Sequence, residues 1–144
     1  MPAKSKPEEA PPSNARELMD FVNQQFGAGT LTMASDPRWQ IQMLPTGLSP
    51  IDHLLKGGVP YGRFVVFHGD YSSLKSYIGL CAIASAQKAG KLAAIIDTEH
   101  AFEPKWAKSL GVDLENLIIR QPETGEQAID TAEALIRGGV DVIV

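Results

Sequence analysis

The chain has 144 residues, which is enough for one domain with a substantial core. It has no apolar run near the ~20 residues that span a bilayer, no apolar stretch typical of a secretory signal and a single cysteine, so we expect a cytoplasmic protein without membrane contact. The formal net charge of −4 indicates no basic face of the kind that DNA-binding proteins usually carry.

The N-terminal part of the chain is predicted to be an appendage to the main domain. Residues 1–13 contain four prolines among charged residues and serine, and we predict a disordered tail. Asn14 can cap a helix whose apolar residues fall on one face until Gly27 ends it, and residues 30–34 are predicted to form a short strand. Residues 14–38 therefore form a helix–strand element that packs on its own core or is donated to a neighbouring chain.

The remaining residues, 39–144, begin with a turn-rich stretch and then alternate apolar strands with helices. Strands that are apolar throughout and alternate with helices are typical of a parallel sheet covered on both faces, so we predict an α/β fold. The predicted elements are a helix near 51–55, a strand at 64–68, a helix from about 74 to 89, a strand at 92–96, a helix from Pro104 to Gly111, a strand at 117–119, a helix capped by Thr124 and running to about 137, and a strand at 140–144.

A loop between the first predicted strand and its helix, at residues 69–76, is similar to the phosphate-binding pattern G-x-x-x-x-G-K-[ST]. Gly69, Lys75 and Ser76 match the pattern, but Leu74 replaces its second glycine. A side chain at that position must lean away from the phosphates, and a φ that only glycine tolerates is closed to leucine. The phosphate cradle is still possible if Leu74 is in a helical conformation.

The chemistry of such a loop assigns a role to each part. Backbone N–H groups before and within the first helical turn would point at phosphate oxygens. Lys75 would act on the β- and γ-phosphates, and the Ser76 hydroxyl would take one Mg²⁺ position, so ATP and Mg²⁺ are the expected cofactors. The alternative is an ordinary polar loop before a helix. The expected nucleotide-binding residues of the loop are Gly69, Asp70, Tyr71, Ser72, Ser73, Leu74, Lys75 and Ser76.

Several stretches of the chain resemble bacterial RecA recombinases in order and spacing, from about Arg16 to the end. Leu74 departs from the bacterial pattern and resembles the phage UvsX-like recombinases, which carry a bulky apolar residue there. The resemblance lies in the segments 25–29, 46–52, 57–63, 69–76, 86–90, 96–101, 110–113, 121–128 and 140–144.

The resemblance implies a RecA-type P-loop ATPase core and assigns further site residues. Glu99 follows the predicted strand at 92–96 and matches the catalytic glutamate that orients or deprotonates the attacking water. Trp106 matches a ring stacked on adenine, and Glu103 matches a carboxylate near the adenine amino group. The alternatives are a solvated turn acid at Glu99 and a core aromatic at Trp106. Asp97 is interpreted as structural.

The resemblance also implies an ATP-dependent DNA recombinase of DNA repair and the SOS response. Such a protein forms a helical filament on single-stranded DNA and exchanges strands with double-stranded DNA, and residues 14–38 would pack on the adjacent copy. We expect the chain to be an N-terminal fragment that stops at the Walker B strand, is itself inactive and contacts DNA through regions beyond residue 144. The alternatives are a RecA-like regulatory or structural module with little ATPase activity, such as a translesion-synthesis accessory, and a hexameric helicase.

Overall fold

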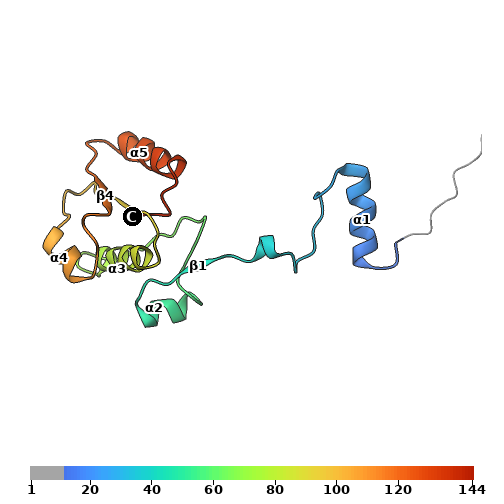
Figure 1. Ribbon diagram of the computed structural model, residues 1–144, viewed down its shortest axis with the longest axis horizontal. Coiled ribbons are helices and arrows are strands. Elements are labelled where there is room, and N and C mark those ends of the chain that lie inside the picture. The colour runs from blue at the N-terminus through green and yellow to red at the C-terminus, as the bar shows by residue number, and fades with distance from the viewer. Residues whose placement is uncertain (1–11) are drawn as a thin grey trace, which may run out of the picture. The chain divides into compact units, whose positions relative to one another are not determined.

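Two compact units make up the chain, one ending at Ile41 and the other spanning Gln42–Val144. The computed structural model in Figure 1 describes residues 12–144, so most of the predicted tail lies outside the described residues. No helix within 12–144 is long and apolar enough to cross a membrane. The elements in chain order are α1 (Ala15–Phe26), the 3-10 helix η1 (Pro37–Trp39), β1 (Met43–Leu44), α2 (Ser49–Leu54), β2 (Val59–Pro60), α3 (Lys75–Lys88), β3 (Ala93–Ile96), α4 (Pro104–Ser109), β4 (Leu117–Arg120), α5 (Gly125–Arg137) and β5 (Val142–Ile143).

Helix α1 begins and ends where the sequence predicts. The side chain of Asn14 accepts hydrogen bonds from the backbone N–H groups of Arg16 and Glu17, at 3.1 and 3.0 Å. The Glu17 carboxylate accepts from both the backbone N–H and the hydroxyl of Ser13, each at 2.8 Å, and these bonds hold the pKa of Glu17 below its ordinary value. Gly27 ends the helix at φ 106°, a conformation that side chains disfavour.

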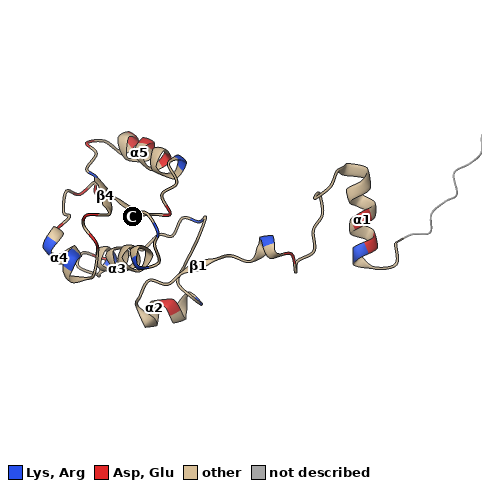
Figure 2. Ribbon diagram, in the orientation of Figure 1, with Lys and Arg blue, Asp and Glu red and all other residues tan. Residues whose placement is uncertain are grey.

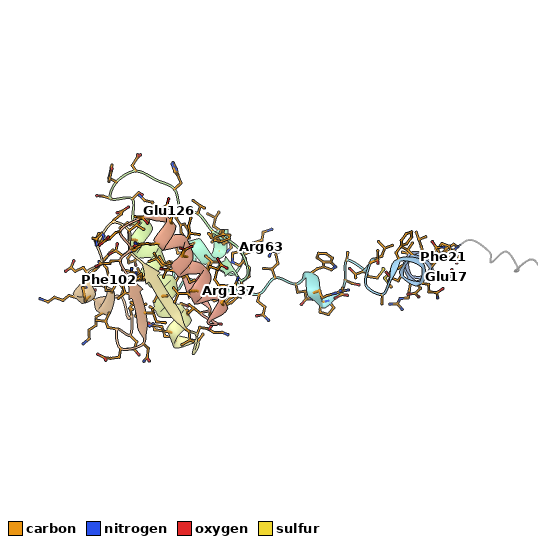
Figure 3. All side chains as sticks on the ribbon, turned by 90° about the horizontal axis from the view of Figure 1, so that it is seen from above. Glu17, Phe21, Arg63, Phe102, Glu126 and Arg137 are labelled. Atoms are coloured by element: carbon orange, nitrogen blue, oxygen red, sulfur yellow. The ribbon has the colours of Figure 1, made fainter. Side chains whose placement is uncertain are left out.

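The apolar face of α1 finds no core within its own unit. No residue of α1 is buried, and Phe26 is 72% exposed. Figure 3 labels Phe21 on this helix, and its side chain is also exposed. The four apolar side chains of this face are Leu18, Phe21, Val22 and Phe26.

The strand predicted at residues 30–34 is wrong. The backbone of Leu31 exchanges two hydrogen bonds with the side-chain amide of Asn23, at 2.8 and 3.0 Å, and Thr32 accepts one from the Trp39 indole at 3.1 Å. No described segment of the chain forms a backbone ladder with these residues. Because a strand needs a hydrogen-bonded neighbour, this segment of bends and turns is held by side chains instead.

A parallel sheet in the order β4-β3-β5 forms the centre of the second unit. Ala93 pairs with Leu117 of β4 on one side and Val142 of β5 on the other. Helices α3 and α5 both contact β3, and Figure 1 shows them on opposite sides of the sheet. The predicted α/β fold, with helices over both faces, is confirmed.

Helix α3 supplies most of the core beneath the sheet. Ile83 is fully buried and packs in one cluster with Leu80, Ile95 and Val112. Burying a side chain of this size stabilises the fold by about 1.5–3 kcal/mol. The helix runs from Lys75 to Lys88, close to the predicted bounds, and this packing fixes the position of its N-terminal end, where the candidate loop joins it.

The strand predicted at residues 64–68 is wrong in this structure. The segment is irregular, and Phe64 and Val66 are 97% and 86% exposed. Within residues 12–144, it pairs with no strand, since β3 lies between β4 and β5 and the outer edge of β5 is unpaired. An apolar run predicts a preference for burial. It becomes a strand only when another segment of the chain pairs with it through backbone hydrogen bonds. A short antiparallel pair, β1–β2, forms instead in the turn-rich stretch before it.

Candidate nucleotide-binding site

The loop at residues 69–76 closes around the ammonium group of Lys75. Its Nζ donates to the carbonyl oxygens of Gly69 and Asp70, at 2.9 and 2.8 Å, and lies 3.3 Å from the Ser73 hydroxyl. A Cβ atom at Gly69 would lie 2.6 Å from the Ser73 hydroxyl, so a larger residue there would require that side chain to move. The loop thus holds a cation at the N-terminal end of α3. The helix dipole has its positive end there too, so both features attract an anion.

Leu74 does not adopt the helical conformation that the sequence analysis considered for it. It lies in the left-handed region, with φ 66° and ψ 19°, at the N-cap of α3. This conformation costs a residue with a side chain about 1–2 kcal/mol, which explains why the common pattern places glycine here. The Leu74 side chain is 62% exposed, so it does not fill the interior of the loop.

Replacing Leu74 by glycine should therefore leave the loop intact and raise its affinity for Mg²⁺·ATP. Glycine adopts the left-handed conformation without strain. It also gives the unfolded chain more conformational freedom, which lowers the free energy of unfolding by about 0.5–1 kcal/mol. The free energy of unfolding should consequently change by less than about 1 kcal/mol. Nucleotide titration and chemical denaturation of the full-length variant check this expectation, and a weaker affinity for ATP would show that the leucine itself contacts the nucleotide.

Two adjoining hollows bring residues of α3, α4 and the loop after β3 together. The first, of about 210 Å³, is lined by Ser76, Glu99, Glu103 and Trp106 among others. The second, of about 500 Å³, is lined by Lys75 and also by Ser76 and Glu99. Ser76 and Glu99 thus face both hollows, at the carboxyl edge of the sheet, where ligands bind in open α/β folds.

Glu99 lies on a short loop that Asp97 organises. The Asp97 carboxylate accepts hydrogen bonds from the backbone N–H groups of Ala101 and Phe102, at 3.2 and 2.9 Å, and from the Gln121 amide at 2.9 Å. Burial raises the pKa of Asp97, but these three bonds outweigh it and leave the pKa below its ordinary value. Asp97 is therefore an anion that folds the loop, which agrees with the structural role predicted for it.

Glu103 and Trp106 lie at the start of α4, one helical turn apart. Pro104 occupies the first turn of the helix, and Glu103 is its N-cap residue but makes no side-chain capping bond. Trp106 is 38% exposed and lines the first hollow, so part of its side chain remains accessible. An open aromatic ring beside an uncommitted carboxylate suits a planar base with an exocyclic amino group.

The other loop residues lie away from these hollows. Among the residues that the structure describes, none of 69–74 lines either hollow, and Tyr71 is fully exposed. Gly69, Asp70, Ser72, Ser73 and Leu74 form the turn that surrounds Lys75, and Ser72 also has a positive φ of 60°. Their predicted contacts with phosphate stay a prediction.

The Ser76 hydroxyl fits the magnesium role predicted for it. Ser76 is exposed in the first turn of α3 and faces both hollows, directly after Lys75. Mg²⁺ in nucleotide complexes keeps phosphate and water oxygens for most of its positions, so one protein hydroxyl at the helix end is sufficient.

Gln121 was missed as a candidate residue by the sequence reasoning. It follows β4 directly, at the same edge of the sheet as Asp97, and its amide reaches across to that carboxylate. A polar residue just past a parallel strand is a signal that the sequence does contain.

Comparison with known proteins identifies the family. The family described as "RecA N-terminal domain" matches residues 14–144. The chain is 46% identical over 126 residues to "Protein RecA" of Clavibacter michiganensis and 46% identical over 127 residues to "Protein RecA" of Francisella philomiragia. Each match covers 85% of this chain and 35% of the relative, so the chain spans about a third of the length of these curated relatives. The chain belongs to the RecA family.

Proposed function

We propose that this chain forms the ATP-binding part of a DNA recombinase that hydrolyses ATP when bound to single-stranded DNA. The observation that carries the proposal is the meeting of Lys75, Ser76 and Glu99 around one hollow at the carboxyl edge of a parallel sheet. A cation, a hydroxyl and a carboxylate are the groups that hold a triphosphate, bind its Mg²⁺ and activate a water. Membership of the RecA family supports recombination and repair as the use of that ATP.

Each residue has a separate part in the proposed reaction. Lys75 leaves its carbonyl partners to bind the β- and γ-phosphates, and Ser76 takes one position on Mg²⁺. Glu99 orients the water and accepts its proton as the water attacks the γ-phosphate. Trp106 stacks on adenine while Glu103 accepts a hydrogen bond from its amino group.

The N-terminal unit has a proposed role in assembly. We assign residues 14–38 to contact with a neighbouring copy in a filament and residues 39–144 to the ATPase core. The unburied apolar face of α1 supports this role, because such a face gains free energy by packing on another surface.

A charged residue on that face should weaken assembly. Phe21→Glu places a carboxylate among Leu18, Val22 and Phe26, so filaments of the full-length protein should shorten or disappear. Electron microscopy and sedimentation with Mg²⁺·ATP and single-stranded DNA measure the effect. Asp20→Asn changes the charge by the same one unit at an exposed neighbour that does not share a face with Phe21, and serves as the matched control. Filaments of normal length with Phe21→Glu would exclude α1 from the assembly contact.

DNA contact is proposed for other parts of the protein. The described residues carry charges of both signs on α1 and α5, as Figure 2 shows, and the net charge of the chain is −4. Single-stranded and double-stranded DNA require a concentration of positive charge along their phosphates. We therefore assign the DNA contacts to parts of the protein other than α1 and α5.

The test of the proposed function is ATP hydrolysis by the full-length protein, with and without single-stranded DNA. We expect DNA to stimulate hydrolysis several-fold. The competing function is a RecA-like nucleotide-binding module that hydrolyses ATP poorly, and the strained Leu74 is the observation that favours it. Tight ATP binding without DNA-stimulated turnover would decide for the module and against the recombinase.

A further inference from the structure

The loop that carries Glu99 is tied to the end of β4 by the backbone bond from the Asp97 N–H to the Arg120 carbonyl, at 2.9 Å, and by one side-chain hydrogen bond. The Gln121 amide donates to Oδ2 of Asp97 at 2.9 Å, and the same oxygen accepts the backbone N–H of Phe102, also at 2.9 Å. The second carboxylate oxygen accepts the N–H of Ala101 at 3.2 Å. One carboxylate therefore joins the start of the loop, its end and a neighbouring strand.

Glu99 lies inside the turn that these bonds close. Asp97 is the anchor at one end and Ala101 the first fixed residue at the other, so only three residues, 98–100, are free between them. His100, next to Glu99, has a positive φ of 56°, a conformation that persists only when its surroundings impose it. The orientation of the Glu99 side chain toward the two hollows therefore depends on the hydrogen bonds that Asp97 makes.

We propose that Asp97 and Gln121 are positioning residues for Glu99. Gln121 holds the Asp97 carboxylate against β4, and Asp97 in turn fixes the turn that aims Glu99 at the water attacking the γ-phosphate. This inference rests on the proposed ATPase. It makes the residues that follow β4 part of the hydrolytic machinery, although Gln121 itself lines neither hollow.

Gln121→Leu, in the full-length protein, is the variant that tests the link. Leucine keeps the approximate size of this exposed side chain and removes the amide whose N–H group donates to Asp97. Displacing a reacting group by a fraction of an ångström lowers turnover without changing binding, so kcat for DNA-stimulated hydrolysis should fall about tenfold or more. The KM for ATP and the affinity for a fluorescent ATP analogue should stay within about twofold of wild type.

Two further variants and one control separate positioning from general stability. Asp97→Asn keeps one acceptor oxygen and should lower kcat less than Asp97→Ala, which removes every bond that folds the turn. Gln87→Leu is the matched control: the Gln87 amide donates to the carbonyls of Asp113 and Asn116 and accepts from the Asp113 N–H, clamping α3 far from Glu99 along the chain. It should lower the thermal midpoint and leave kcat unchanged at temperatures where the variant is folded.

Hydrogen exchange at the amides of Ala101 and Phe102 adds a readout that does not depend on turnover. Gln121→Leu should speed their exchange, whereas Gln87→Leu should not. Unchanged exchange, or an unchanged kcat in a protein whose wild type hydrolyses ATP, would overturn the inference while leaving the proposed function in place. If the wild-type protein shows no DNA-stimulated hydrolysis, the proposed function is wrong, and so is this inference, which depends on it.

Discussion

Replacing Glu99 by glutamine should abolish ATP turnover and leave ATP binding intact. Glutamine has almost the same shape as glutamate, but its amide cannot accept the proton of the attacking water. A positioned general base contributes about 10²–10⁴-fold to a rate, so kcat for DNA-stimulated hydrolysis should fall by about that factor. Because Glu99 is exposed and faces both hollows, the substitution should cost little stability.

Single-turnover hydrolysis and equilibrium titration with a fluorescent ATP analogue measure these two properties separately. Glu126→Gln makes the same chemical change in the first turn of α5, at a residue labelled in Figure 3, and should leave both unchanged. Turnover by Glu99→Gln within about twofold of wild type would remove Glu99 from the catalytic role.

Replacing Lys75 by alanine should remove most of the affinity for ATP. The ammonium group is held at the N-terminal end of α3 by two carbonyl oxygens, and a phosphate would exchange these neutral acceptors for charged ones. A hydrogen bond to a charged group contributes about 1.5–3 kcal/mol, so the dissociation constant should rise about ten- to a hundred-fold or more. The loop also loses its internal donor, which adds to the effect.

The charge can be separated from the shape of the loop with two further variants. Lys75→Arg keeps the charge and should recover part of the affinity, although its planar guanidinium fits the carbonyl partners differently. Lys88→Ala removes a lysine at the other end of α3 and should have no effect on nucleotide titration. Unchanged affinity in Lys75→Ala would mean that residues 69–76 are not a phosphate site.

The helices could be predicted from local signals because their ends are determined by neighbouring residues. Asn14 and Thr124 cap α1 and α5 with their own side chains, and Pro104 begins α4. Gly27 and Gly111 end or follow helices with a positive φ, as expected of glycine. Each of these interactions spans only a few residues, so the sequence contains the whole signal.

The failed strands show the opposite case. Residues 64–68 and 30–34 are mostly apolar or β-branched, yet a strand exists only when a second segment supplies its hydrogen bonds. The strands that pair with β3 are residues 117–120 and 142–143. The composition of an apolar run does not determine which segments pair with each other. Pairing between distant segments is therefore the part of the fold that local pattern leaves open.

The candidate site divides in the same way. Ser76, Glu99, Glu103 and Trp106 were predicted one at a time, and the structure brings all four to one hollow. The left-handed conformation of Leu74 went against the preference of its side chain and could not be predicted from it. The bond from Gln121 to Asp97 joins residues 24 positions apart, so it appears only when β3 and β4 pair.

Residues 69–76 are proposed to hold the phosphates of ATP, and hydrogen exchange of this loop in the full-length protein measures whether they do. The backbone amides from Gly69 to Ser76 should exchange more slowly when Mg²⁺·ATP is added, because their N–H groups would be donated to phosphate oxygens. Protection should be absent with Mg²⁺ alone and lost in Lys75→Ala. Unchanged exchange across this loop, in protein saturated with ATP, would mean that these residues do not bind its phosphates.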